Sequence, residues 1–212
     1  MHNIMAIFRK EMNAFFSSPM AYIFLVVFAL INGYFFNIQF FLINESDMRV
    51  LFSIIPIVYL FFIPAVSMGL ISREKGIGTI EIISTLPINE RDIVLGKYLA
   101  GFSLILLGLA TTLFFYLNLV YVGSNIDHGA VFTGYIGLAL LGGVYTSIGL
   151  FSSSLTENQV IAFIIGIAIS GNTSILNLER VKNPAIIINI INRFAATVFV
   201  INQRIIFFMV LV

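Results

Sequence analysis

The chain contains no cysteine and only two histidines, His2 and His128. Disulfides, iron–sulfur clusters and thiolate zinc sites are therefore excluded, and two imidazoles cannot build a histidine-rich metal centre. Charge is also scarce, because Asp, Glu, Lys and Arg make up only 10% of the 212 residues and the formal net charge is +1. This balance excludes an intrinsically disordered chain and leaves no basic surface for nucleic acid.

Apolar residues dominate instead, at 59% of the chain, and the mean hydropathy is +1.04. A typical globular protein has roughly 45–50% apolar and about 25% charged residues. So few charges cannot cover a soluble domain of 23.6 kDa without leaving large apolar patches in contact with water. The composition indicates an integral membrane protein.

The charged residues separate five uncharged runs, and each run is long enough for a bilayer-spanning helix of about 20 residues. The predicted spans are 20–43, 50–72, 98–122, 130–152 and 158–178. A sixth span over 194–212 carries Arg204 and stops at the last residue, so we expect an incomplete sixth helix. The first apolar run is too long for a cleaved signal peptide. The sequence thus predicts an all-α, polytopic helical bundle in a single transmembrane domain, residues 1–212.

The distribution of basic residues predicts the orientation, because Lys and Arg gather in cytoplasmic loops. A cytoplasmic N-terminus places six basic residues on the cytoplasmic side, whereas the first two outside loops hold only Arg49. The six are Arg9, Lys10, Arg73, Lys75, Arg91 and Lys97. Residues 1–18 carry apolar side chains at helical spacing, which predicts an amphipathic helix in the cytoplasmic membrane interface. The alternative is a frayed terminus with a few anchoring residues.

Several short patterns predict local structure. Thr156 and Gln159 match a capping box that would begin the fifth span, and Asn89 is placed to cap the third. The fourth span carries small residues that allow close approach of helices. These residues are Ala139, Gly142, Gly143 and Ser147. They fit either packing within one subunit or a dimer interface.

The charges concentrate in one segment, since residues 72–97 hold eight of the 21 acidic and basic residues. Within it, four apolar residues recur on one helical face, and Pro87 ends the helix. The four are Ile77, Ile80, Ile83 and Leu86. We expect a short amphipathic helix lying crosswise under the membrane, in a cytoplasmic loop over 73–92. Residue pattern alone leaves two interpretations open, a surface that docks another protein and a solvated loop that only sets the topology.

The run REKGIGTIEIISTLPI at residues 73–88, followed by IVLGKYLA at 93–100, resembles the cytoplasmic signature of type-2 permeases of ABC exporters. The run GLFSSSLTENQ at 149–159 resembles the turn between the fourth and fifth spans of the same proteins. The similarity is greatest to the gliding-motility-associated permease branch and covers residues 1 to 170. The tail differs, because Ile205 replaces an acidic residue that is usual after Arg204.

This resemblance implies a six-span permease half in the bacterial inner membrane, surrounded by lipid. It also implies a homo- or heterodimer with a second permease half and two cytoplasmic ABC ATPase subunits. The loop after the second span would carry a coupling helix that docks into a cleft of the ATPase. The matching docking positions are Glu74, Gly76, Gly78, Thr79, Glu81, Leu86 and Pro87, with a secondary cytoplasmic contact at Thr156, Glu157 and Asn158.

Catalytic, cofactor and metal sites are not expected in this chain. It has no phosphate-binding loop, and Gly76 and Gly78 form only a lone Gly-x-Gly, so ATP and Mg²⁺ would bind to the partner ATPase. The span centres carry no ionisable residue, which disfavours a proton relay. Residues 152–154 are expected to be turn serines. The predicted function is a noncatalytic permease subunit of an ABC exporter. Alternatives are a self-sufficient secondary transporter or channel, and a structural anchor of a motility or envelope complex.

Overall fold

The computed structural model describes residues 2–38, 40, 48–80, 89–122 and 127–178, and every regular element in these residues is a helix. The helices are α1 (His2–Ser17), α2 (Pro19–Asn37), α3 (Arg49–Ser67), α4 (Ser72–Ile77), α6 (Glu90–Val122), α7 (His128–Ser154) and α8 (Gln159–Leu178). The all-α fold predicted from the composition is therefore confirmed.

Four helical stretches of the described residues are long and apolar enough to cross a membrane. They are Pro19–Asn37, Leu51–Ile77, Glu90–Tyr121 and His128–Ser154, and α8 adds the shorter apolar stretch Gln159–Asn172. These helices confirm a polytopic helical membrane protein. The proposed sixth span at 194–212 lies outside the described residues, as does the first outside loop up to residue 47.

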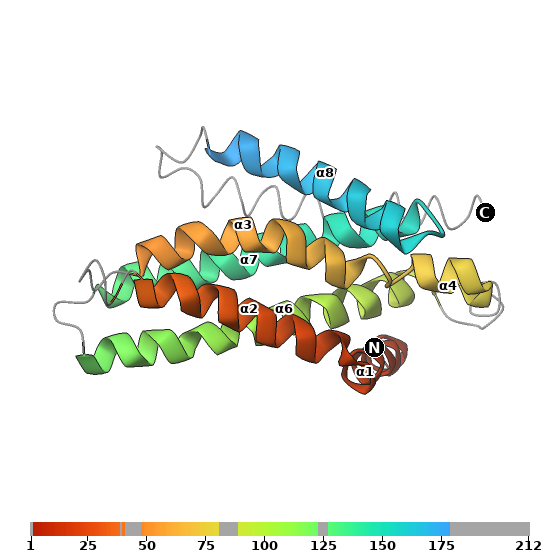
Figure 1. The fold of residues 1–212 in the computed structure, drawn as a ribbon. Coiled ribbons are helices and arrows are strands. Elements are labelled where there is room, and N and C mark those ends of the chain that lie inside the picture. Colours follow the sequence, from red (N-terminus) through yellow and green to blue (C-terminus); the bar gives the residue numbers. More distant parts are fainter. Residues whose placement is uncertain (1, 39, 41–47, 81–88, 123–126, 179–212) are drawn as a thin grey trace.

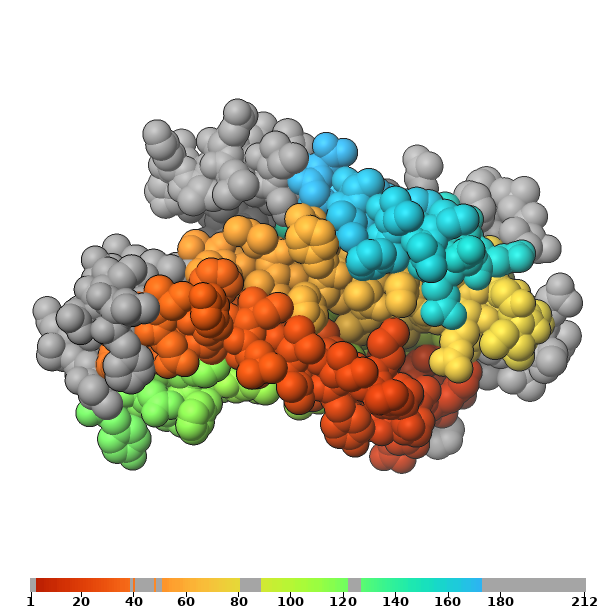
Figure 2. Space-filling model, viewed as in Figure 1, coloured from red at the N-terminus to blue at the C-terminus, as the bar shows by residue number. Residues whose placement is uncertain are grey.

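The long helices lie alongside one another, with α3 in contact with α2, α7 and α8, while α6 contacts α1, α2 and α7 (Figure 1). In Figure 1, α1 is seen almost along its axis at one end of the bundle, and α4 extends beyond that same end. The space-filling view shows α8, in cyan and blue, lying over α3 (Figure 2). The two segments expected in the cytoplasm are thus at one end of the molecule.

Helix α1 packs its apolar face against α6. At Gly96 of α6 the two backbones come close, because a Cβ added there would lie 2.7 Å from Cγ2 of Ile7 and 3.1 Å from the carbonyl oxygen of Ile4. The predicted helix at the N-terminus is confirmed, and its apolar residues contact protein. Its position in the membrane interface stays a prediction.

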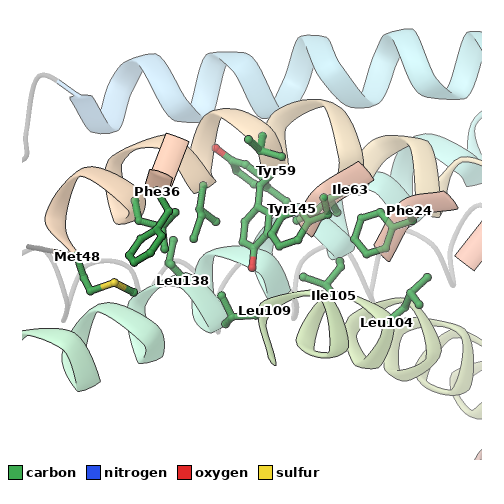
Figure 3. Close-up of a cluster of buried hydrophobic side chains, with 14 of the residues drawn as sticks. Phe24, Phe36, Met48, Tyr59, Ile63, Leu104, Ile105, Leu109, Leu138 and Tyr145 are labelled. Atoms are coloured by element: carbon green, nitrogen blue, oxygen red, sulfur yellow. The ribbon is translucent and has the colours of Figure 1, made fainter. Parts of the chain in front are cut away.

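Buried aromatic and aliphatic side chains from α2, α3, α6 and α7 form the main core (Figure 3). The Phe28 and Tyr59 rings stack with centroids 5.8 Å apart. Gly142 of α7 lets this helix approach its neighbours, since a Cβ there would lie 3.1 Å from Cγ2 of Ile105 and 3.5 Å from Cε2 of Tyr59. Gly142, one of the small residues of the fourth span, therefore serves packing within one subunit.

Two helix starts were predicted, and one of them is wrong. Helix α6 begins at Glu90, directly after Asn89, as expected, and the backbone amide of Asp92 donates to the Asn89 carbonyl oxygen at 2.9 Å. A cap by the Asn89 side chain stays a prediction. The capping box at Thr156 is not formed, because the residue before α8 is Asn158. Its Oδ1 accepts from the amide of Val160 at 2.9 Å, while Thr156 Oγ1 accepts from the amide of Asn158 itself. A side chain one residue before the helix satisfies the free amide, so Thr156 forms only the preceding turn.

Gly149 of α7 faces Ser67 of α3, and a Cβ at this position would lie 2.8 Å from the Cβ of Ser67. We predict that Gly149→Ala lowers stability by about 1–3 kcal/mol, because neither buried backbone can retreat from the added methyl group. Gly137→Ala in the same helix is the matched control, since no atom lies within 4 Å of its added Cβ. Thermal unfolding in detergent measures the difference. Equal melting temperatures for the two variants would contradict this packing.

Candidate functional site

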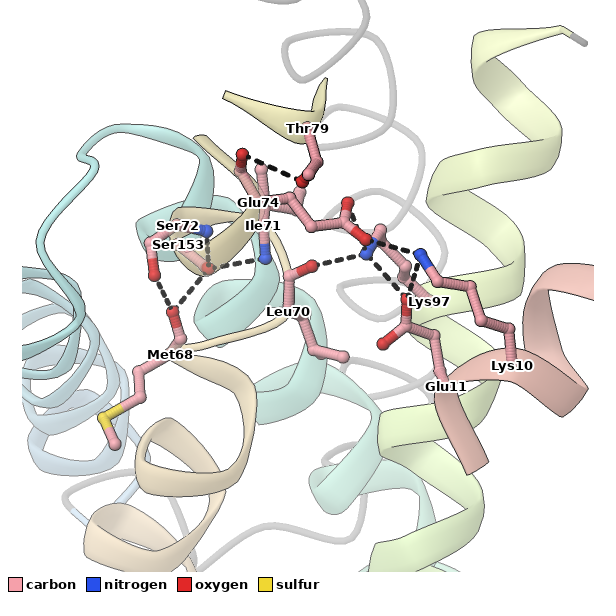
Figure 4. Close-up of polar contacts among 10 residues, drawn as sticks. All are labelled: Lys10, Glu11, Met68, Leu70, Ile71, Ser72, Glu74, Thr79, Lys97 and Ser153. Atoms are coloured by element: carbon pink, nitrogen blue, oxygen red, sulfur yellow. Dashed lines mark hydrogen bonds and ion pairs between the residues drawn. The ribbon is translucent and has the colours of Figure 1, made fainter. Parts of the chain in front are cut away.

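A turn joins α3 to α4 at the end of the bundle where α1 lies (Figure 1). Ser153, at the end of α7, holds this turn with its hydroxyl group (Figure 4). Ser153 Oγ accepts hydrogen bonds from the amides of Ile71 at 3.0 Å and Ser72 at 2.9 Å, and it donates to the carbonyl oxygen of Met68 at 2.6 Å. The first amides of a helix lack partners within the helix. A side chain of α7 therefore caps α4.

Helix α4 ends at Gly78, whose φ of 76° is the left-handed conformation that glycine adopts most readily. The amide of Gly78 donates to the Lys75 carbonyl oxygen at 3.0 Å, and Thr79 Oγ1 donates to that of Glu74 at 3.3 Å. The prediction that one helix includes both Ile77 and Ile80 is therefore wrong, whereas residues 79 and 80 are helical again and 81–88 lie outside the described residues. A left-handed residue turns the chain, so Ile77 and Ile80 do not share one helical face.

Four charged side chains meet beside α4 and form an ion network of Lys10, Glu11, Glu74 and Lys97 (Figure 4). Lys97 Nζ lies 2.8 Å from Glu11 Oε1 and 2.9 Å from Glu74 Oε2. It also donates to the carbonyl oxygen of Leu70 at 2.6 Å. Lys10 Nζ donates to Glu74 Oε1 at 2.8 Å. The network joins α1, α4, α6 and the turn before α4.

Lys97 is 1% exposed, so its ammonium group has almost no contact with water. Such a group costs several kcal/mol of desolvation unless partners replace the lost water. An ammonium group has three N–H donors, and three oxygen atoms surround this one. The two lysines and two glutamates also cancel in formal charge. The network is therefore a compensated buried cluster that fixes the positions of its members.

The pKa of the Glu74 carboxyl group reflects the same contacts. Burial alone would raise this pKa, but the positive charges of Lys97 and Lys10 outweigh burial and hold it below its usual range. Burial would likewise lower the pKa of Lys10, and the two carboxylates raise it instead. Because the pKa of Glu74 is lowered in the folded state, its contribution to stability is present at neutral pH. That contribution is lost as the pH falls through the lowered pKa.

The two segments singled out by their sequence motifs lie next to each other. A Cβ added at Gly76 of α4 would lie 3.2 Å from the carbonyl oxygen of Glu157, in the turn between α7 and α8. Helix α4 also contacts α8. The side chains of Glu157 and Asn158 are exposed, and so are Ile77 and Gly78. These four exposed residues, named the docking surface, are the candidate site for a partner protein.

The predicted docking residues divide into three groups. Gly76, Gly78, Glu157 and Asn158 are at the surface. Glu74, Thr79 and Thr156 are partly buried, and the Glu74 carboxylate is engaged in the ion network. Glu81, Leu86 and Pro87 lie outside the described residues. Glu74 therefore positions α4 and does not offer its charge to a partner.

Sequence reasoning missed Ile77 as a surface residue and Glu11 and Lys97 as site residues. Ile77 is the last residue of α4, directly before the left-handed Gly78, and its side chain is 68% exposed. The sequence could have indicated that Lys97 is buried, because it has helical spacing with Ile93, Ala100 and Leu104. All four residues are buried on one face of α6.

A protein-family model described as ABC-2 family transporter protein matches residues 37–177, about two thirds of the chain. The chain belongs to the ABC-2 transporter family. It is therefore a multi-pass membrane subunit of an ABC transporter, a class that works with separate ABC ATPase subunits. No curated protein matches the chain. The matched range includes both α4 and the turn at Glu157.

We predict that Lys97→Met lowers the free energy of unfolding by about 3–5 kcal/mol, because it leaves the carboxylates of Glu11 and Glu74 without their main partner. Lys10→Met is the control from the same network. Its side chain is 59% exposed, so this loss should cost only about 0–1 kcal/mol. Denaturant unfolding in detergent compares the two. Equal destabilisation would show that the buried ammonium group does not hold the network together.

We also predict that Ser153→Ala destabilises the start of α4 by about 1–3 kcal/mol, since two buried amides lose their acceptor. Hydrogen exchange at the amides of Ile71 and Ser72 should speed up. Ser154→Ala is the matched control, because its hydroxyl group donates to the Phe151 carbonyl oxygen within α7. If both variants leave exchange at residues 71 and 72 unchanged, Ser153 does not cap α4.

Proposed function

We propose that this chain is the permease subunit that couples ATP hydrolysis by a partner ATPase to movement of a substrate across the membrane. The docking surface of Ile77, Gly78, Glu157 and Asn158 would bind the ATPase. The observation that carries this proposal is the contact between Gly76 and the Glu157 backbone. It supports the proposal because two motifs 81 residues apart, at Gly76 and Glu157, form one surface beyond the ends of α3 and α7.

The chemistry of the docking surface suits a protein partner. Protein interfaces combine an apolar, well-buried centre with a polar rim. Ile77 is a large apolar side chain that is 68% exposed, at the tip of α4. Glu157 and Asn158 provide acidic and amide groups beside it, and both are exposed. A cleft with an apolar floor and a basic edge would complement this surface.

The contacts behind the docking surface connect α4 to three other helices, which would move with it. Glu74 ties α4 to Lys97 of α6 and to Lys10 of α1. Ser153 ties the beginning of α4 to α7. A displacement of α4 by the ATPase would therefore be shared by three other helices, two of which cross the membrane. This is how closure of the ATPase would tilt the spans.

The proposal extends to the exporter class, because residues 73–88 and 149–159 resemble the signatures of type-2 permeases of ABC exporters. The same resemblance supports membership of the gliding-motility-associated branch, pairing with a second permease half and location in the bacterial inner membrane. ATP and Mg²⁺ would bind to the ATPase subunits. A neighbouring reading frame with a phosphate-binding loop would identify the ATPase to use in a binding assay.

We predict that Ile77→Asp weakens binding of the cognate ATPase at least tenfold, because a charge replaces the apolar centre of the docking surface. The measurement is co-purification of the two subunits from membranes, followed by titration in detergent. Met5→Asp is the matched control, an equally large exposed side chain on α1 at the same end of the bundle. It should leave ATPase binding within about twofold of the wild type.

Wild-type ATPase binding by Ile77→Asp, at normal expression and melting temperature, would reject this docking surface. Binding lost equally by Ile77→Asp and Met5→Asp would also count against it, because α1 would then be part of the interface. Glu157→Lys is a second test of the docking surface, at a residue in the turn between α7 and α8. It should weaken ATPase binding without changing thermal stability, since this side chain is exposed.

A further inference from the structure

A pocket of about 290 Å³ opens beside the ion network, between α1, α3, α4 and α8. This volume is close to the lower end of the range of ~300–1,000 Å³ for ligand pockets, so it fits a small polar group. Its walls combine charged and apolar side chains. They include Lys10, Glu74, Arg73, Phe15, Met20 and Gln159.

Positive charge is in excess when the pocket walls are counted together with Lys97 behind them. Glu11 and Glu74 also line it, but Lys97 approaches both carboxylates from behind, at 2.8 and 2.9 Å. Within the described part of the chain Arg73 is exposed and makes no ion pair. The buried Lys97 and the lining residue Lys10 thus balance the two carboxylates, and the charge of Arg73 is left over. The surplus charge suits an anionic group placed near Arg73 and Lys10.

A second, apolar groove of about 140 Å³ borders this pocket. The two share Phe15, Met20, Ala65 and Val66 in their walls. The groove then extends between α2 and α3 along Phe24 and Phe62. Figure 2 shows the face on which α2, α3, α4 and α8 come to the surface together. A charged compartment therefore adjoins an apolar one that follows two spans.

We propose that this composite site binds one anionic glycerophospholipid, with its phosphate at Arg73 and Lys10 and one acyl chain in the groove between α2 and α3. The polar compartment is at the end of the spans, where the headgroups of a bilayer lie. The apolar compartment runs along helices that face the acyl chains. The occupant must therefore carry an anion and a hydrocarbon chain on one molecule, which a phospholipid does and a free phosphate or peptide does not.

A lipid at this site would contact the elements that position the docking surface. Its phosphate would lie beside Lys10, which donates to Glu74, and beside Arg73 of α4. Its chain would fill the space between α2 and α3. The bound lipid would therefore support α4 from the membrane side, whether or not the ATPase docks as proposed above.

The test uses the full chain in detergent micelles that contain equal amounts of phosphatidylglycerol and phosphatidylcholine, with retained lipids counted by native mass spectrometry. The wild type should retain one phosphatidylglycerol in preference to phosphatidylcholine. Arg73→Gln should reduce this preference about tenfold, the usual effect of losing one charged hydrogen bond. Arg91→Gln is the control, an exposed arginine in the first turn of α6 that does not line the pocket.

The groove is tested with Met20→Trp, which places a large ring where the two compartments join. Retention of the lipid should fall at least tenfold, whereas Val26→Trp should retain it. Val26 is an exposed residue of the same helix that lines neither compartment. Equal retention of the two lipids by the wild type would overturn the proposal. Unchanged preference in Arg73→Gln, or unchanged retention in Met20→Trp, would also overturn it. Melting temperatures within a few degrees of wild type show that each variant is folded.

Discussion

The arrangement of α1, α4 and α6 depends on one buried ammonium group, that of Lys97. A charge that is 1% exposed is tolerated only where oxygen atoms replace its water. Its three oxygen partners come from Glu11 of α1, Glu74 of α4 and the backbone of Leu70 before α4. Removing any one partner would leave part of the charge unpaired. Helix α4 therefore has one favourable position relative to α1 and α6.

The contact between α4 and the turn before α8 follows from this position of α4. With α4 held by Glu74 from one side and capped by Ser153 from the other, Gly76 is brought against the backbone of Glu157. The absence of a side chain at Gly76 permits this close approach. A six-residue helix is far too short to be stable alone, so these tertiary contacts determine its place.

Much of the fold could be predicted from the sequence, because a bilayer requires long apolar helices and the charges mark their ends. The preference of asparagine for the position before a helix also predicted that α6 starts after Asn89. Prediction failed at Gly78, where periodicity of the apolar residues concealed a left-handed turn. It missed Glu11 and Lys97 because a topology argument counts charged residues as loop residues. The pairing of Glu11 with Lys97 depends on how α1 crosses α6. The spacing of residues along the chain does not determine that crossing.

The structure also divides the residues of the predicted docking motif by role. A motif of consecutive residues mixes side chains that face a partner with side chains that place them. Glu74 faces inward to Lys97, and Thr79 bonds back to the Glu74 carbonyl oxygen. Ile77 alone among the described side chains of α4 presents a large apolar surface outward. If the ATPase docks as proposed, a substitution at Glu74 would disturb its binding through the orientation of α4, and a substitution at Ile77 would do so through contact. The two mechanisms differ in one observable, because only the first also lowers the stability of the permease.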